Sequence, residues 1–393
     1  GKAIMKDTLS ISAYLATREI WRNRARFLLV SLVIALITLL VLFIAALGEG
    51  LGNGNREYIS KLDAELIAYQ AKSDTLIAAS RLDRTRLAAI RRVDGVADAG
   101  PLGAASVTII LPGDAEPLKA AMLGVEPGHV GEPAVVQGSQ LSTDLARETI
   151  IDSNTALRTG LQVGDTLTIR VTQGTRDEFF EMKVVGISDG QQYSLQPSIF
   201  VPFFTWDRIR PKSEAEVSRS NPVANVILVK LADPQSVDAV GTRLTAQVDG
   251  IEVATKRDAI QALPGYSAQQ STLNTQGGFT LFIGVLVIGG FFQIQILQKV
   301  SQIGVLKAIG TANPVVAAAS VLQIVIITFI GVAIGALLAF IFSLTFPPTV
   351  PIVFNGTTSA IALIALLLIG PLGGMVSIRY AVRIEPLKAL GLS

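Results

Sequence analysis

The sequence contains no cysteine and only one histidine, which excludes several kinds of chemistry. Without cysteine, the chain can form no disulfide, thiol nucleophile or thiolate metal site. The histidine, His129, lies in the loop Pro127-Gly128-His129-Val130, where it could ligate a metal or heme iron. No cluster of further ligands is visible around it, and metal and catalytic sites need converging groups. We therefore interpret His129 as an ordinary loop residue and predict no catalytic residue and no metal site.

Charge is missing from four long apolar segments, although 16% of all residues are charged. With half of its residues hydrophobic and a mean hydropathy of +0.51, the chain is too apolar for an ordinary soluble protein. Each uncharged segment is long enough to cross the roughly 30 Å hydrocarbon core of a bilayer. The sequence therefore predicts four transmembrane α-helices, at 27–47, 279–298, 315–344 and 360–378. Ion-coupled carriers and intramembrane proteases need ionisable groups within the membrane, so both classes are disfavoured.

The sequence also lacks the P-loop pattern G-x-x-x-x-G-K-[ST]. Since that loop cradles the phosphates of a nucleotide, the chain is not expected to bind ATP by itself in the usual way. Any ATP and Mg²⁺ would belong to a partner, and no cofactor is expected in this chain. No nucleic acid is expected as a partner either.

The charged residues are sorted along the chain rather than mixed. Residues 48–276 hold 22 of the 33 basic residues and 28 of the 31 acidic ones, so the rest of the chain is strongly basic. That basic excess lies in three segments, at 1–26, 299–314 and 379–393. The positive-inside rule places these segments, and with them both termini, in the cytoplasm. Residues 48–278 and the loop 345–359 would then face outward from the plasma (inner) membrane.

The N-terminal segment 1–26 is amphipathic. Its apolar side carries Ile11, Tyr14, Leu15 and Trp21, while arginines gather toward its end. A helix of this composition lies at a membrane surface with its apolar face in contact with lipid. Membrane lipid is therefore an expected partner of the chain.

The pattern of residues 48–278 predicts an α+β domain between the first and second transmembrane helices. Strands are expected at 66–69, 107–111, 149–152, 167–171, 179–187, 198–202, 226–231 and 252–254, and helices at 82–92, 154–159 and 234–248. This pattern describes a split α/β unit with a β-rich unit, about 145–205, inserted between its halves. The polar stretch 258–278 is expected to form a stalk back to the membrane, with a break at Pro264-Gly265.

Small and polar residues inside the predicted spans indicate how the helices pack. Gly331 and Gly335 form a G-x-x-x-G pattern, which permits close contact between helices. Hydrogen bonds between helices would explain the burial of Gln293, Gln295 and Gln323. For the first two, placement at the membrane interface is an equally good explanation.

The most informative stretch is the polar island 299–314, KVSQIGVLKAIGTANP, which separates two apolar spans. Its apolar residues recur at helical spacing, and they are Ile303, Leu306 and Ile309, with Val305 beside them. Gln302 and Lys307 lie off that stripe. Gly310 and then Pro314 follow at the point where a two-turn helix would stop. A helix this short is marginal alone in water, so its apolar stripe is expected to pack on another protein surface.

The run from Gln302 to Thr311, QIGVLKAIGT, resembles the coupling segment of FtsX/MacB-type ABC transporter permeases, E-I-G-x-L-K-A-x-G-A/S. In that family the segment docks into a separate ATPase subunit and transmits the motion of ATP binding and hydrolysis. The resemblance implies that the coupling residues here are Gln302, Ile303, Gly304, Val305, Leu306, Lys307, Ala308, Ile309 and Gly310. It also implies a homodimer that works with two ATPase copies. Gln302, where Glu is usual, and Thr311 depart from the pattern.

Other segments extend the resemblance over most of the chain. The arrangement of the outer domain and the passage LRTGLQVGDTLTI are similar to the periplasmic domain of MacB-type permeases. The first span and the segment AELIAYQAKS look closest to the DevC and HrtB branch, which implies export of a lipid-like compound, of heme or of a drug. Two alternatives stay open. One is an FtsX-like regulator that transmits force without transport, and the other is a membrane-anchored ligand receptor. A periplasmic adaptor is a further partner that the family admits.

Overall fold

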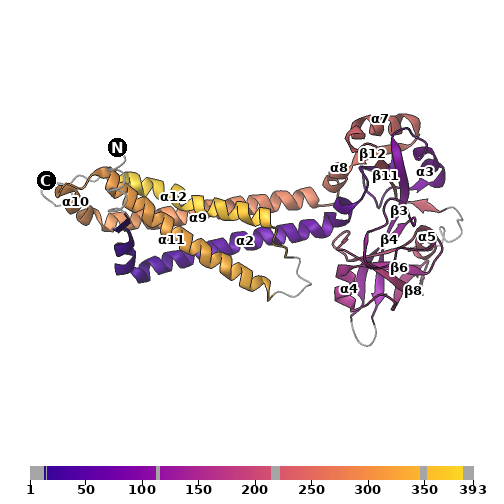
Figure 1. Ribbon diagram of the computed structural model, residues 1–393, viewed down its shortest axis with the longest axis horizontal. Helices are drawn as coiled ribbons and strands as arrows, with labels where there is room; N and C mark the ends of the chain where they lie inside the picture. Colours follow the sequence, from indigo (N-terminus) through magenta and orange to yellow (C-terminus); the bar gives the residue numbers. More distant parts are fainter. Residues whose placement is uncertain (1–12, 15, 112–115, 214–221, 346–351, 384–393) are drawn as a thin grey trace. The chain divides into compact units, whose positions relative to one another are not determined.

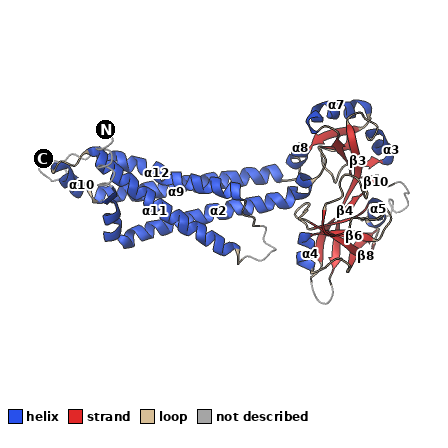
Figure 2. Ribbon diagram, viewed as in Figure 1, coloured by secondary structure: helices blue, strands red, loops and turns tan. Residues whose placement is uncertain are grey.

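The computed structural model describes residues 13–14, 16–111, 116–213, 222–345 and 352–383. The chain forms two compact units. Residues 1–50 and 270–393 make up a helical unit, and residues 51–269 make up an α/β unit (Figure 1 and Figure 2).

The helical unit is built from long apolar helices and one short one. They are α2 (Arg24–Lys61), α9 (Tyr266–Gln298), α10 (Val300–Ala308), α11 (Asn313–Ser343) and α12 (Gly356–Arg383). Four of these, all but α10, are long and apolar enough to cross a membrane. Residues 16–22 form a further helical segment before α2. The predicted fold class, four spans with an α+β unit between the first and second, is confirmed.

The spanning helices extend beyond the predicted apolar runs. Helix α2 continues to Lys61, and α9 begins at Tyr266, so the polar stretch expected as a stalk is largely the first part of α9. The expected break lies just before it, at Gly265, whose φ is 75°. Hydropathy marks the part of a helix that suits the membrane, whereas its ends depend on caps and packing. Of the expected N-terminal helix, outer loop and C-terminal tail, residues 1–12, 15, 346–351 and 384–393 lie outside the described residues.

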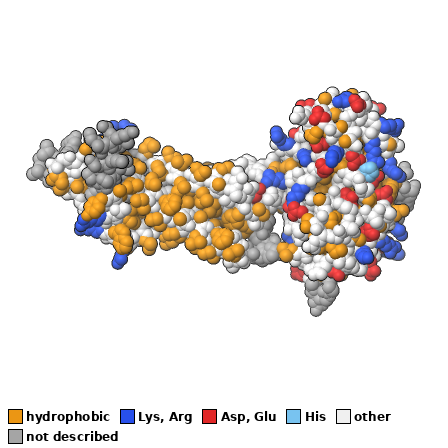
Figure 3. Space-filling model, viewed as in Figure 1, with side chains coloured by type: hydrophobic (Ala, Val, Ile, Leu, Met, Phe, Trp, Pro, Cys, Tyr) orange, Lys and Arg blue, Asp and Glu red, His pale blue; other side chains and the backbone are white. Residues whose placement is uncertain are grey.

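The core of the helical unit draws side chains from all four spans. Its buried residues are Phe27, Val30, Ile34, Val41, Ile288, Phe292, Ile324, Ile327, Val332, Leu366 and Ile369. The outer surface is also apolar, and Figure 3 shows hydrophobic side chains over the visible face of this unit, while charged ones spread over the α/β unit. Such a continuous apolar exterior suits contact with lipid.

Glycines allow the helices to approach closely. A Cβ atom added to Gly331 would lie 2.6 Å from Cβ of Ile34 in α2. One added to Gly335 would lie 2.5 Å from the carbonyl oxygen of Ala35. The G-x-x-x-G pattern therefore packs α11 against α2 of the same chain. Gly289 in α9 meets the backbone of Gly373 in α12 in the same way, a contact that hydropathy gave no reason to expect.

The α/β unit contains the remaining elements. Its strands are β1 (Leu66–Gln70), β2 (Leu82–Asp83), β3 (Val96–Ile110), β4 (Leu118–Val125), β5 (Val135–Gly138), β6 (Glu148–Asp152), β7 (Thr166–Gln173), β8 (Arg176–Ser188), β9 (Ser198–Pro202), β10 (Val223–Ala224), β11 (Val226–Leu231) and β12 (Ile251–Thr255). Its helices are α3 (Arg84–Ile90), α4 (Ser153–Thr159), α5 (Phe203–Ile209), the 3₁₀ turn η1 (Pro234–Ser236), α7 (Val237–Gln247) and α8 (Lys256–Gln261).

One large sheet contains all of these strands except β2 and β10, which pair with each other. At one end, β12, β1, β11 and β3 pair side by side, so the strands expected late in the domain do join the first half. Beyond them, β3, β4, β9, β6, β8 and β7 pair in turn, and β7 pairs back onto β3. This closed ring encloses a core of alternating residues such as Ile109, Met122, Ile169 and Ile199.

The ring corrects the extent of the β-rich unit that was expected as an insertion at about 145–205. Strands β6 to β9 do lie there, but they close only by pairing with β3 and β4 from outside that range. Their edges would otherwise expose unpaired backbone groups. Strand β3 begins at Val96 rather than 107, and β4, β5 and α5 were not predicted. Gly103 in β3 and Gly124 in β4, which weaken the strand signal, leave room for the ring of Trp206 in α5.

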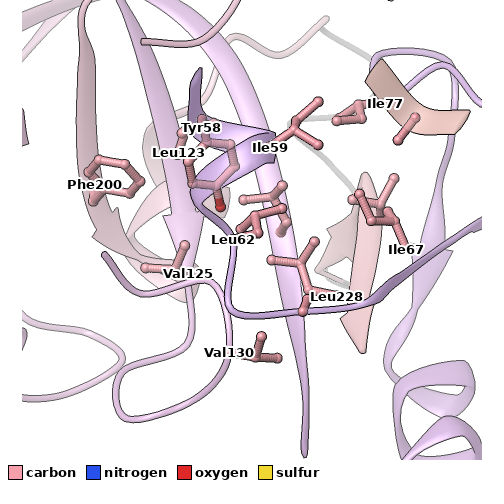
Figure 4. Packing of buried hydrophobic residues seen from close by; sticks show 14 of the residues in the cluster. Tyr58, Ile59, Leu62, Ile67, Ile77, Leu123, Val125, Val130, Phe200 and Leu228 are labelled. Atoms are coloured by element: carbon pink, nitrogen blue, oxygen red, sulfur yellow. The ribbon is translucent and has the colours of Figure 1, made fainter. Parts of the chain in front are cut away.

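The last turns of α2 belong to a second core of the α/β unit. Tyr58 is 1% exposed and Ile59 is fully buried, and they pack with Leu123, Phe200 and Leu228 (Figure 4). The rings of Tyr58 and Phe200 are 5.6 Å apart. The first transmembrane helix therefore ends inside the hydrophobic core of the α/β unit.

Candidate coupling site

Helix α10 ends where its sequence predicts, although it occupies only Val300–Ala308 of the expected segment 299–314. It ends in a Schellman motif, in which the backbone N–H of Thr311 donates to the carbonyl of Leu306 and that of Gly310 to the carbonyl of Lys307, each at 3.0 Å. Gly310 has a φ of 99°, a left-handed conformation that favours glycine. The prediction of a two-turn helix that stops at Gly310 is confirmed.

The apolar stripe of α10 is divided between two environments. Ile303 is only 9% exposed and packs with Ile296 of α9 and Val316 of α11. Val305 and Ile309 are 45% and 74% exposed. The expectation that the whole stripe faces a partner is therefore wrong for Ile303, because that side chain holds α10 to the adjoining spans of its own chain. The exposed apolar surface of α10 centres on Val305 and Ile309.

The other predicted coupling residues surround these. Gly304 is buried, Leu306 is half-buried, and Gln302, Ala308 and Gly310 are exposed. Lys307 Nζ donates a 2.6 Å hydrogen bond to the carbonyl oxygen of Val382, near the end of α12. Burial lowers the pKa of Lys307. The predicted segment is thus contiguous, but its members point both into the helical unit and away from it.

A polar cluster lies beside α10. Glu19, in the helical segment 16–22, forms an ion pair with Lys299 at the junction of α9 and α10. Its other carboxylate oxygen accepts a 2.6 Å hydrogen bond from Nε2 of Gln323 in α11. This bond accounts for the buried Gln323. Sequence reasoning missed Glu19, although it is the one acidic residue among the arginines of its segment.

These side chains line a cavity of about 390 Å³ at the α10 end of the helical unit. Its walls come from the helical segment 16–22, α9, α10 and α11. Gln295, in α9, also lines it and is 2% exposed, and its Nε2 has no hydrogen-bond partner among the described residues. The side chain of Gln295 is therefore buried and lies against this cavity.

His129 belongs to the α/β unit and has a local role there. Its Nδ1 lies 2.8 Å from Oδ1 of Asp98, and its Nε2 lies 3.8 Å from Oε1 of Glu126. Within the described ranges, no group of three or more potential metal-ligating side chains was found. Partial burial opposes ionisation of Asp98, but hydrogen bonds from His129 and from the backbone N–H groups of Val130 and Ala99 outweigh it and lower the pKa of Asp98.

Comparisons with known proteins agree with this architecture. Residues 27–247 match the family of the MacB-like periplasmic core domain, and residues 275–386 match the family of the FtsX-like permease C-terminal domain. A Staphylococcus epidermidis protein, HrtB, whose name describes a hemin transport system permease, is 25% identical over 379 residues, which cover 96% of this chain and 99% of that protein. A Mycobacterium bovis ABC transporter permease is 23% identical over 388 residues, with the same coverage.

Solved structures of extracytoplasmic domains show similarity over about half of this chain. The extracellular domain of the ABC-type transporter YknZ from Gram-positive bacteria has a TM-score of 0.35 and 15% identity, covering 49% of this chain and 99% of that one. The periplasmic region of MacB from Actinobacillus actinomycetemcomitans has a TM-score of 0.37 and 12% identity, covering 52% and 95%. The match to the MacB-like domain covers more than half of this chain, and the match to the permease domain covers most of the remainder. The chain therefore belongs to the FtsX-like ABC transporter permeases that carry a MacB-like periplasmic core domain.

Proposed function

We propose that this permease subunit works as a homodimer that exports a hydrophobic or amphipathic molecule, driven by two copies of a separate ATPase that dock on α10. The proposal is carried by two exposed apolar residues of α10, Val305 and Ile309. The other side of this short helix packs through Ile303 on α9 and α11. An exposed apolar pair is suited to a partner surface, while the buried residue passes movement to α9 and α11. ATP and Mg²⁺ would reside on the ATPase.

The short connections around α10 support the transmission of force. Only Lys299 separates α9 from α10, and α11 follows α10 after four residues, 309–312. Movement of α10 would therefore move both spans. Helix α9 carries the chain directly to the α/β unit, and α2 ends in the core of that unit at Tyr58. ATP-driven docking would in this way rearrange the α/β units of the dimer.

The distribution of charge supports the orientation. The basic excess lies in the segments around α10, whereas residues 48–276 are acidic overall. The positive-inside rule then places α10 in the cytoplasm, where ATP is available, and the α/β unit outside the plasma membrane.

The proposed class of substrate is supported by an apolar cleft and by the names of similar proteins. A cleft of about 270 Å³ between α2 and α11 is lined by residues such as Leu36, Leu40, Phe43 and Phe342. Apolar walls of this kind favour a lipid-like or aromatic ligand. Hemin, which the name of the Staphylococcus relative mentions, is the first compound to test, followed by lipids and hydrophobic drugs.

The experiment compares wild type with Ile309→Asp after gentle solubilisation from the native membrane. The matched control is Leu157→Asp, since Leu157 is an apolar residue of α4 that is 67% exposed, close to the 74% of Ile309. An ATPase should co-purify with wild type and with the control, and should be lost from Ile309→Asp. If all three proteins, intact and folded, retain no ATPase, or all retain it equally, docking on α10 is wrong.

Substrate stimulation separates transport from force transmission alone. ATPase activity of the reconstituted complex is measured with hemin, with lipid and with neither. Stimulation by one compound, together with its ATP-dependent movement across the vesicle membrane, supports export. An active complex that moves none of these compounds would support the FtsX-like regulator instead.

A further inference from the structure

We infer that the cavity beside α10 binds the headgroup of an anionic phospholipid. This inference concerns a lipid site in the helical unit and does not depend on ATPase docking or on the transported substrate. Its starting point is the cavity of about 390 Å³, which is lined by both charged and apolar side chains.

The charged lining favours an anion. Arg18, Arg22 and Lys299 line the cavity, and Glu19 is its one acidic lining residue. The carboxylate of Glu19 is already engaged by Lys299 and by Gln323. Positive charge therefore remains in excess, and a phosphate group would balance it.

A buried donor points to a ligand within the cavity. Gln295 lines the cavity, is 2% exposed, and its Nε2 has no acceptor in the described part of the chain. An unpaired buried amide donor costs free energy, and buried donors in native proteins nearly always have partners. A phosphate or glycerol oxygen in the cavity would supply the missing acceptor.

The apolar lining favours a lipid over a free anion. Phe292, Ile296 and Ile324 also line the cavity and belong to the hydrophobic cores of the helical unit. Trp21, in the same helical segment as Arg18 and Arg22, is 75% exposed. Tryptophan at the end of a transmembrane bundle is typical of the membrane interface, so this cavity lies at the depth of headgroups. Basic pockets between spans are suited to anionic headgroups.

The test measures binding of phosphatidylglycerol to the full chain in detergent, with phosphatidylcholine for comparison. Native mass spectrometry gives the occupancy, and thermal melting over a lipid titration gives the affinity. Wild type should prefer phosphatidylglycerol. Arg18→Gln with Arg22→Gln should weaken phosphatidylglycerol binding by about 25-fold, because each arginine near an anionic lipid contributes roughly a fivefold gain. Both arginines are exposed, so this variant should fold.

Two further variants show whether the effect belongs to the cavity. Gln295→Met keeps the side-chain length and should weaken phosphatidylglycerol binding about fivefold by removing one donor. Arg379→Gln with Arg383→Gln removes the same charge from exposed positions of α12 that do not line the cavity, and should leave binding unchanged.

Three results would overturn the inference. One is equal binding of the two lipids by wild type. Another is an equal loss in the Arg18/Arg22 and Arg379/Arg383 variants, which would show general surface attraction. The third is saturation by inorganic phosphate or glycerol 3-phosphate at the concentration that phosphatidylglycerol needs, which would show a free anion site instead of a lipid site.

Discussion

Nε2 of Gln323, in α11, donates a 2.6 Å hydrogen bond to the carboxylate of Glu19, 304 residues earlier in the chain. Glu19 also pairs with Lys299, at the start of α10. A single half-buried carboxylate thus joins the N-terminal helical segment, the α9–α10 junction and α11. Any movement of α10 must either carry these segments along or break this cluster.

The bond between Gln323 and Glu19 should contribute measurably to stability. We expect Gln323→Leu and Glu19→Leu to show a coupling energy of about 1.5 kcal/mol in a double-mutant cycle, because each change removes the bond and a hydrogen bond to a charged acceptor is stronger than a neutral one. Unfolding of each variant in mixed detergent micelles measures it. Strict additivity of the two single effects would show that the bond contributes nothing to folding.

Close packing of α11 on α2 should make Gly331 intolerant of a side chain. Gly331→Ala would place a methyl group 2.6 Å from Cβ of Ile34, and overpacking of this kind costs about 1–3 kcal/mol. Gly290→Ala in α9 is the control, because a Cβ there meets nothing within 4 Å. Thermal melting in detergent should show a clear loss for Gly331→Ala only. Equal melting temperatures would contradict the packing.

In the α/β unit, alanine substitutions at Gly103 and Gly241 should change stability in opposite directions. Gly103→Ala would push a methyl group into the ring of Trp206 and should destabilise the unit by about 1–3 kcal/mol. Gly241→Ala, in α7, would place its Cβ 3.9 Å from Leu66 and should stabilise by about 0.5–1 kcal/mol through helix propensity. Tryptophan fluorescence during denaturation reports on Trp206 alone when the variants are made in a Trp21→Phe background, because Trp21 is the only other tryptophan in the sequence. A neutral Gly103→Ala would mean that α5 is displaced at little cost.

Asp98 should make stability depend on pH in the acid range. Its pKa in the folded protein is lowered, so its contribution is fully present above the unfolded value of about 3.9 and is lost as the pH falls through the folded value. Asp98→Asn should therefore cost about 1 kcal/mol at pH 7 and progressively less in acid. Denaturant unfolding at several pH values measures the difference.

Asp249→Asn is the control for Asp98, since Asp249 is an exposed carboxylate of the same unit. It should match wild type at every pH. A deficit for Asp98→Asn that stays constant down to pH 2 would mean that the bonds to His129 and Val130 do not depend on the charge of Asp98.

Much of the architecture could be predicted from local sequence. Hydropathy predicts the four spans because an uncharged helix of sufficient length is the structure that a bilayer favours. The stop of α10 at Gly310 is equally local, since it depends on one residue with a left-handed conformation. The family was recognisable from the run QIGVLKAIGT, which the matched permease domain at 275–386 contains.

The pairing of distant strands could not be predicted in this way. Strand β7 pairs with β3, and β9 pairs with β4. The alternation of apolar and polar residues can locate a strand, but it does not tell which distant strand it pairs with. Strand β3 was found only in part because Gly100, Pro101 and Gly103 conceal its first half. The two glycines are explained by close approaches from residues later in the chain, since Gly100 lies against the Val130 carbonyl and Gly103 against the ring of Trp206.

By itself, the sequence determined the number of spans, the sorting of charge and the position of a short helix between two spans, because each depends on neighbouring residues. Only the tertiary structure decided which side of α10 is exposed. Helical spacing groups Ile303 with Ile309, and packing against Ile296 and Val316 separates them. The tertiary structure also brought Glu19 to Gln323 and left Gln295 facing a cavity. Such contacts arise only when distant helices pack around a shared space.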